Sequence, residues 1–322
     1  MTYHVLVPDN VHASAVDVLK AAGDGLAYTA RGQITRDELL AEIVNTDALM
    51  IRSAHKIDQP VLDAAQNLRV IARAGVGVDN VDLTAATERG VIVMNTPDGN
   101  TVSTAEHTLG LMLALARHIP QSHISMNEGK WDRKTYGGVE LRGKTLGLVG
   151  FGRIGRAVAK RALAFDMSVV TYDPYITAEQ AGAAGVRQVS LDDLFAQSDF
   201  ISLHALLTDE TRNLVNKETI AKMKPGVRIV DAARGALINE ADLAEALQSG
   251  QVAGAALDVY VQEPPDPNNP LLHLPNVVHT PHLAASTEDA QIVVAVEAAQ
   301  LVVAALLKGE YKNVVNQAVL AK

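Results

Sequence analysis

The chain has 322 residues, 48% of them hydrophobic, which is enough for two domains with separate cores and excludes a disordered chain. A net charge of −9 and an aromatic content of 4% argue against a nucleic-acid partner. Cysteine is absent, which excludes disulfides, thiolate nucleophiles and cysteine-based metal sites and fits a reducing cytoplasm.

The N-terminal residues 1–9 predict a first strand and no export signal, because no cationic segment precedes an apolar one. The longest apolar stretch, 292–307, is interrupted by Glu297 and Gln300. It is also shorter than the ~20 residues of a membrane span, so it predicts a core helix. We therefore expect a cytoplasmic protein without a membrane partner.

Short β-rich runs alternate with helical patterns over the first hundred residues, which predicts a small parallel α/β sheet. The predicted strands are 5–7, 48–51, 69–72 and 91–95, and the predicted helices lie near 11–22, 36–45, 60–66 and 82–88.

A long apolar-periodic helix is predicted at 101–119, and a second alternating series follows it. Six strands with intervening helices predict a doubly wound domain, and a long helix over 286–307 is expected to return to the first domain. The six predicted strands are 145–149, 169–172, 200–203, 228–230, 253–257 and 277–279.

A glycine-rich turn follows the first strand of the second series and opens a helix, which is the context of a dinucleotide-binding turn. Gly150 permits the tight turn, Gly152 removes a Cβ that would block a pyrophosphate, and Gly155 lets the helix approach the strand. The helix N-terminus then offers free N–H groups to the phosphates.

Asp173 ends the next strand, 18 residues after Gly155. A carboxylate there accepts hydrogen bonds from ribose hydroxyls and repels a 2′-phosphate, which favours NAD over NADP. Arg153, close by in sequence, leaves NADP open.

Arg234 follows the fourth strand of this series, at the edge where open α/β sheets bind ligands. A guanidinium there can grip a carboxylate in bidentate fashion and polarise a neighbouring carbonyl. The alternative interpretation, for Arg234 seen alone, is an ordinary surface arginine in a loop.

His282 lies just past the sixth strand, and imidazole suits proton exchange near neutrality. His204 is the main competitor among ten histidines, with a structural or cofactor-lining role as its alternative; the others, His55 and His107 included, have a structural or solvated default. Glu263, before two prolines, can hold the His282 tautomer and stabilise its imidazolium. Together with Arg234 they form a predicted hydride-transfer site.

The chain resembles the D-isomer-specific 2-hydroxyacid dehydrogenases along nearly its whole length. Five runs carry the resemblance in order: Arg73-Ala74-Gly75-Val76-Gly77-Val78-Asp79-Asn80-Val81-Asp82, Gly129-Lys130-Trp131-Asp132-Arg133, Tyr172-Asp173-Pro174-Tyr175, Ala233-Arg234-Gly235 and Pro281-His282-Leu283-Ala284-Ala285-Ser286-Thr287. The resemblance implies that Arg234 binds the substrate carboxylate and that Glu263 pairs with His282 as general acid/base.

The resemblance also implies two larger residue sets and no metal. The implied cofactor residues are Val76, Thr104, Gly150, Gly152, Arg153, Ile154, Gly155, Asp173, His204, Ala205, Ala232, Ala233, Arg234, Asp258, His282 and Ala284. The implied substrate residues are Arg52, Ser53, Arg73, Gly75, Val76, Arg133, Arg234 and His282, with Arg133 contributed across a homodimer interface.

Arg52, Arg73 and Arg133 favour a phosphorylated 2-hydroxy acid, because local positive charge must bring a doubly anionic substrate to an acidic protein. The sequence departs from the family pattern at three places: Asp231 replaces a usual Asn, Ala205-Leu206 follows His204 where the usual sequence is His-x-Pro, and Ala284 replaces a usual Gly. None removes a proposed catalytic group.

We therefore expect two parallel-sheet α/β domains, Rossmann-like and flavodoxin-like, flanking a cleft. The substrate-binding domain is predicted at 1–98 and 287–322, the NAD-binding domain at 99–286, and no C-terminal regulatory domain is expected. The expected function is oxidation of a phosphorylated 2-hydroxy acid. The alternatives are a hydroxypyruvate/glyoxylate or other 2-hydroxyacid reductase, and an NAD-sensing corepressor on the same scaffold.

Overall fold

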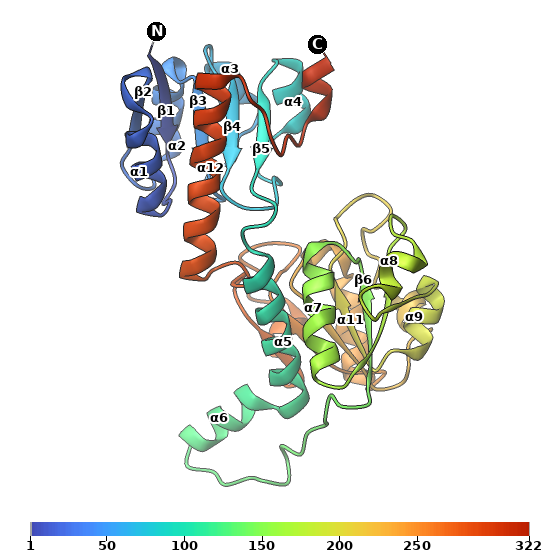
Figure 1. The fold of residues 1–322 in the computed structure, drawn as a ribbon. Coiled ribbons are helices and arrows are strands. Elements are labelled where there is room, and N and C mark those ends of the chain that lie inside the picture. Colours follow the sequence, from blue (N-terminus) through green and yellow to red (C-terminus); the bar gives the residue numbers. More distant parts are fainter. Residues whose placement is uncertain (1, 322) are drawn as a thin grey trace. The chain divides into compact units, whose positions relative to one another are not determined.

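The computed structural model describes residues 2–321, which divide into two compact units (Figure 1). Unit 1 contains the residues up to Asn100 and those from Ser286, and unit 2 is Thr101–Ala285. Each unit is built on one sheet in which all strand pairs are parallel. The predicted fold class of two parallel α/β sheets is confirmed.

Unit 1 has a five-stranded sheet of order β2-β1-β3-β4-β5, in which the chain reverses its direction of growth between β1 and β3. Its strands are β1 (Tyr3–Val7), β2 (Leu26–Ala30), β3 (Ala48–Ile51), β4 (Val70–Arg73) and β5 (Ile92–Asn95). Its helices are α1 (Ala13–Ala21), α2 (Arg36–Glu42), α3 (Gln59–Ala64), α4 (Leu83–Glu88) and α12 (Glu288–Lys308).

Two apolar cores cover the faces of this sheet, because strands buried on both faces carry apolar side chains at consecutive positions. Residues of α1 and α12 fill one face, and residues of α2, α3 and α4 fill the other. Among the described residues only α12 is long and apolar enough, by composition, to cross a membrane. Its Ala298, Ala299 and Val302 are fully buried in the core of unit 1, as expected of a core helix.

Unit 2 has a seven-stranded sheet of order β12-β11-β10-β9-β6-β7-β8. Its strands are β6 (Thr145–Val149), β7 (Ser168–Tyr172), β8 (Arg187–Gln188), β9 (Phe200–Leu203), β10 (Val227–Asp231), β11 (Val252–Leu257) and β12 (Val277–His279). Its helices are α5 (Thr101–Arg117), α6 (Ile119–Asn127), α7 (Arg153–Ala164), α8 (Ala178–Gly182), α9 (Leu191–Gln197), α10 (Lys217–Ile220) and α11 (Glu240–Ser249).

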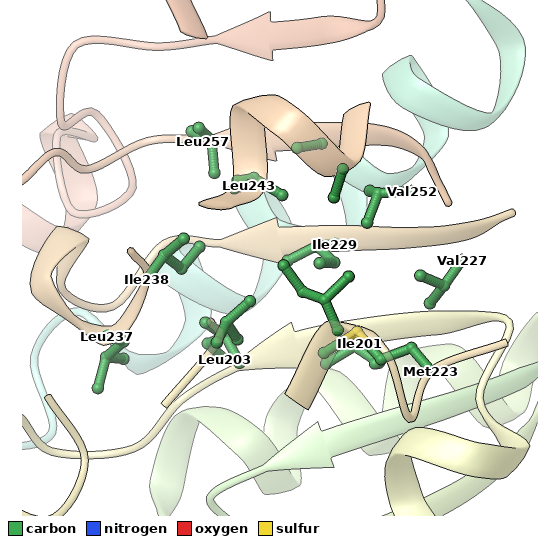
Figure 2. Close-up of a cluster of buried hydrophobic side chains, with 14 of the residues drawn as sticks. Ile201, Leu203, Met223, Val227, Ile229, Leu237, Ile238, Leu243, Val252 and Leu257 are labelled. Carbon is green, nitrogen blue, oxygen red and sulfur yellow. The ribbon is translucent and has the colours of Figure 1, made fainter. Parts of the chain in front are cut away.

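The sheet of unit 2 is covered on both faces. One core contains Ile201, Ile229 and Leu243 from β9, β10 and α11, which Figure 2 shows packed together. The opposite core contains residues of α5 and α7, which lie side by side. The strand order reverses between β6 and β9, so this edge of the sheet has the switch point at which doubly wound folds bind ligands.

The structure adds two strands to those predicted. β2 is an edge strand with a single buried residue, Leu26, and β8 has two residues, Arg187 and Gln188, neither of them buried. Edge strands need less apolar surface than central ones, so the apolar pattern that predicts strands is weak in both. The predicted 101–119 helix is two helices, because His118 between them has a left-handed backbone with φ of 51°.

Candidate active site

The glycine-rich turn joins β6 to α7. Gly150 has φ of 96°, and a Cβ there would lie 2.7 Å from the backbone carbonyl of His204. A Cβ on Gly155 would overlap the Gly150 carbonyl. In contrast, no neighbouring atom lies within 4 Å of the Cβ position of Gly152. Gly150 and Gly155 therefore serve the fold, whereas Gly152 leaves open space beside the first turn of α7, where a pyrophosphate can approach the helix N-terminus.

Asp173 follows β7 and hydrogen-bonds to the same turn. Its Oδ2 accepts from the Phe151 N–H at 2.7 Å, and its Oδ1 accepts from the Tyr175 N–H at 2.9 Å. An ionised carboxylate has about four lone-pair sites, so each oxygen retains acceptor capacity for a ribose hydroxyl. Asp173 thus links the glycine turn to the end of the neighbouring strand.

His282 and Glu263 form a hydrogen-bonded pair. His282 Nδ1 lies 2.7 Å from Glu263 Oε2, and Glu263 Oε1 accepts from the Tyr260 N–H at 3.1 Å. The His282 and Glu263 side chains are 49% and 39% exposed, so the pair is open to a ligand. Because Nδ1 is occupied by Glu263, proton exchange with a ligand falls to Nε2.

The two members of this pair shift each other's pKa. The hydrogen bond to Glu263, assisted by the charge of Glu263, raises the pKa of His282 against the opposing effect of burial. Burial acts to raise the pKa of Glu263, but the hydrogen bond and charge of His282 hold that pKa below its usual value. Both shifts favour the imidazolium–carboxylate form of the pair.

Asp258, at the end of β11, holds the loop that carries His282. Its fully buried carboxylate accepts from Thr280 Oγ1 at 2.5 Å, from the Leu283 N–H at 2.8 Å and from the Ala284 N–H at 2.9 Å. Its backbone carbonyl accepts from the His282 N–H at 2.8 Å. His282 has φ of 53°, so these contacts hold an uncommon left-handed backbone in place.

His107 of α5 also contacts Asp258, a role that the sequence analysis did not assign to it. Its Nε2 lies 3.3 Å from Asp258 Oδ1 and 3.1 Å from Thr280 Oγ1. Burial acts to raise the pKa of Asp258, but hydrogen bonds, led by that of His107, hold it below its usual value. Thr104, three residues earlier, is buried and its Oγ1 has no hydrogen-bond partner among the described residues.

Arg234 follows β10 and lies close in sequence to a buried acid. Arg234 Nη1 donates to the Ala233 carbonyl at 2.7 Å, and Asp231 Oδ1 accepts from the Ala233 N–H at 2.8 Å. Asp231 is fully buried, and this burial raises its pKa to about 7. Burial thus disfavours the charged form of Asp231, the form that would compete with a substrate carboxylate for the guanidinium of Arg234.

His204, the competing acid/base candidate, is placed differently. Its Nε2 lies 2.9 Å from Ser202 Oγ, and its backbone abuts Gly150. Burial lowers the pKa of His204 to about 4, so its ring is neutral near neutrality. A neutral ring bonded to a serine suits a structural or pocket-lining role better than proton transfer.

A cavity of about 370 Å³ lies beside the His282–Glu263 pair. Tyr260, Pro264 and Leu272 give it an apolar wall, and His282 and Glu263 line it as well. The remaining predicted cofactor residues of unit 2 lie at or just after the turns that follow β6, β9, β10 and β12, and so share the carboxyl edge of the sheet: Arg153, Ile154, Ala205, Ala232, Ala233 and Ala284.

The predicted substrate arginines of unit 1 lie at one edge of its sheet. Ile51, the last residue of β3, pairs with Arg73, the last residue of β4, and Arg52 follows Ile51 directly. Gly75 has φ of 146°, a backbone conformation that residues with a Cβ rarely adopt, and the guanidinium of Arg73 lies against the side of Gly75 that has no Cβ. Val76 follows in the same turn, where its carbonyl accepts from Asn95 Nδ2 at 2.6 Å. Ser53, the remaining predicted substrate residue of unit 1, is exposed.

Arg133 lies in an exposed segment after α6. Trp131 is 76% exposed, and Ile124 and Met126 of α6 are 56% and 52% exposed. Exposed apolar side chains mark an interface with another chain where they form a contiguous patch. The homodimer and the role of Arg133 across it stay predictions.

Comparison with known proteins identifies the scaffold. The family model described as "D-isomer specific 2-hydroxyacid dehydrogenase, NAD binding domain" matches residues 109–284. D-3-phosphoglycerate dehydrogenase of Archaeoglobus fulgidus is 49% identical over 312 residues, 97% of this chain and 59% of that relative. The chain thus spans little more than half the length of this curated relative.

Two solved structures are also similar. A glyoxylate reductase from Paecilomyes thermophila has a TM-score of 0.88 and 31% identity, covering 98% of this chain and 99% of that one. A D-lactate dehydrogenase from Aquifex aeolicus, solved with NAD and lactic acid, has a TM-score of 0.84 and 29% identity, covering 95% and 96%.

The coupling of His282 to Glu263 is measurable. In Glu263→Gln the neutral amide removes the carboxylate that raises the pKa of His282, so this pKa is expected to fall. An NMR titration of the His282 ring protons in both proteins measures the change. His204 is the internal reference, because its ring is expected to stay neutral from pH 6 to pH 8 in both. An unchanged His282 titration would contradict the coupling.

Proposed function

Because the chain belongs to the D-isomer specific 2-hydroxyacid dehydrogenase family, we propose that it oxidises D-3-phosphoglycerate to 3-phosphohydroxypyruvate with NAD, the first step of serine biosynthesis. The observation that carries the reaction type is the His282–Glu263 pair, which lies at the sheet edge where Arg234 and the glycine turn also lie. The likeness to the phosphoglycerate dehydrogenase of A. fulgidus supports the substrate.

The residues of unit 2 fit NAD. The open space at Gly152 suits the pyrophosphate and Asp173 suits the ribose hydroxyls. Buried Thr104 has a hydroxyl oxygen with no hydrogen-bond partner within residues 2–321. When bound, NAD accepts the hydride from C2 of the substrate. The carboxylate of Asp173 also disfavours the 2′-phosphate of NADP.

The side chains then have separate tasks. Arg234 holds the substrate carboxylate and polarises the adjacent oxygen. Neutral His282 takes the hydroxyl proton at Nε2 during oxidation and returns it during reduction. Glu263, which shares the opposite side of the ring, stabilises the imidazolium formed. Asp258 keeps His282 in place through the backbone of the loop.

Arg52 and Arg73 are proposed to bind the phosphate. The neighbouring strands β3 and β4 end at the same edge of the sheet, so Arg52 and Arg73 lie at adjacent strand ends. A phosphate with a charge near −2 is best matched by more than one cation. We also propose a homodimer in the cytoplasm, supported by the exposed apolar residues of α6 and Trp131.

A second candidate is reduction of unphosphorylated 2-oxo acids, supported by the likeness to a glyoxylate reductase over almost the whole of both chains. The same Arg234, Glu263 and His282 would serve it. The remote alternative is an NAD-sensing corepressor. Such a protein would bind NADH tightly and bind a protein partner, but it would turn over none of the tested acids.

Gly152→Ala tests the cofactor site. The added methyl group meets no protein atom, so the melting temperature should stay unchanged, while the methyl group fills the space proposed for the pyrophosphate. We expect the Kd for NADH to rise about 10- to 100-fold, because the pyrophosphate can no longer approach the helix N-terminus closely. Gly182→Ala, equally open in α8, is the control with unchanged affinity. Unchanged NADH binding in Gly152→Ala would refute the placement.

His282→Ala tests the acid/base role. We expect NADH binding to persist and turnover to fall ~10²- to 10⁴-fold, the usual contribution of a general acid/base group. In the unchanged protein, oxidation needs neutral His282, so its rate should rise with pH through the raised His282 pKa, while reduction should fall. Near-normal turnover in this variant would rule out the assignment. Lys20→Ala, an exposed residue of α1 in unit 1, is the control.

A substrate panel tests the phosphate proposal. We expect the highest kcat/KM for 3-phosphoglycerate and 3-phosphohydroxypyruvate, and lower values for hydroxypyruvate, glyoxylate and D-lactate, measured with NAD or NADP in the matching redox state. Arg52→Ala and Arg73→Ala should raise KM for the phosphorylated acids ~10-fold or more, as for a lost charge-assisted hydrogen bond. Arg69→Ala removes an equal charge at the opposite end of β4 and should leave KM for the phosphorylated acids unchanged. Equal losses for both acid classes would refute phosphate recognition.

A further inference from the structure

A buried histidine bridges two loops at the carboxyl edge of unit 1. His55, in the loop after β3, is 6% exposed, and its Nδ1 hydrogen-bonds to Asp9 in the loop after β1. Its Nε2 lies 3.0 Å from the Ile34 carbonyl oxygen. β1 and β3 are neighbours in the sheet and flank the position where the strand order reverses. The bridge therefore spans the switch point, where sheets of this order bind ligands.

The same pair holds the backbone of Arg52. Asp9 Oδ2 accepts from the Arg52 N–H at 2.6 Å. Asn80 Nδ2 donates to the Arg52 carbonyl at 2.9 Å and to the His55 carbonyl at 2.7 Å. The guanidinium of Arg52 donates through Nη1 to the Asn10 carbonyl at 3.2 Å. The side chains of Asp9 and Asn80, which come from two other loops, thus bind the N–H and the carbonyl group of Arg52.

Both ring nitrogens of His55 are needed for this arrangement. A carbonyl oxygen only accepts, so Nε2 donates to Ile34, and a single proton lies between Nδ1 and Asp9. Asp9 is 2% exposed, so its carboxyl group has no solvent to replace a lost partner. Removing either member leaves a buried polar group unsatisfied, and burying such a pair costs free energy that an apolar side chain would avoid. Packing alone therefore does not explain why a histidine and an aspartate are buried at this position.

We propose that His55 and Asp9 are positioning residues that hold Arg52 in the conformation that binds the substrate phosphate. The bridge keeps the loops after β1 and β3 at a fixed separation, and Asp9 fixes the Arg52 backbone between them. This inference rests on the proposed phosphate-binding role of Arg52. It assigns the specificity for phosphorylated acids partly to two residues that do not touch the substrate.

The test compares KM for 3-phosphohydroxypyruvate and hydroxypyruvate in the full chain, with NADH as reductant. His55→Ala and Asp9→Ala should raise KM for the phosphorylated acid about 10- to 100-fold, as a small misplacement of a binding group does. KM for hydroxypyruvate, kcat and NADH affinity should change little. Lys56→Ala, an exposed neighbour outside the bridge, is the matched control and should behave as the unchanged protein.

Asp9→Asn separates positioning from general stability. Its amide oxygen can accept from the Arg52 N–H while its NH₂ group donates to His55 Nδ1, so the bridge geometry survives without the charge. This variant should recover most of the phosphorylated-acid KM lost in Asp9→Ala. Circular dichroism melting of each variant shows whether the fold is retained.

The outcomes separate this inference from the proposed function. If Arg52→Ala raises the phosphorylated-acid KM but His55→Ala and Asp9→Ala do not, the positioning role is refuted and the phosphate role of Arg52 stands. If the two bridge variants impair both acids equally, the bridge is merely structural and the inference is also refuted. If Arg52→Ala itself has no effect, the phosphate role fails first, and the positioning role with it.

Discussion

The buried carboxylate of Asp258 is the interaction on which the candidate site depends. A carboxylate removed from water must be matched by donors, and here the donors are His107 of α5, the Thr280 hydroxyl and two consecutive backbone N–H groups of the loop after β12. Satisfying Asp258 therefore shapes that loop and leaves His282 with a left-handed backbone. The ring of His282 then meets Glu263, which is held by the Tyr260 N–H. The position of the proposed base is set by a residue on a different strand.

In both sheets the parallel arrangement of strands brings functional side chains to one edge, but the chemistry of those side chains differs. Parallel strands all end at one edge, so side chains that are distant in sequence gather there. In unit 2 that edge carries the glycine turn, Arg234 and His282. In unit 1 it carries Arg52 and Arg73, with the His55–Asp9 bridge across the point where strand order reverses. The proposed division between hydride transfer and phosphate recognition follows this division of the chain.

Much of this arrangement could be predicted from local pattern. Strands such as β6 and β9 are continuous apolar runs, and the glycine turn follows β6 directly, so both were predictable. The edge strands β2 and β8 lack such runs and were missed. The local sequence around His55 and His107 predicts only a structural or solvated role for each. Their burial and partners depend on segments 46 and 173 residues away, which no local pattern encodes.

The sequence by itself determined the alternation of strands and helices, the conformation of the glycine turn and the positions of Arg234, Glu263 and His282 at strand ends, because these depend on neighbours a few residues apart. Only the tertiary structure decided which histidine acquired which partner. His204 is half-buried beside Ser202 and burial lowers its pKa to about 4, whereas His282 is half-exposed beside Glu263 and has its pKa raised. The physical reason is that burial lowers the pKa of His204, whereas a hydrogen bond to a carboxylate 19 residues away raises that of His282, and both conditions exist only after the sheet has formed.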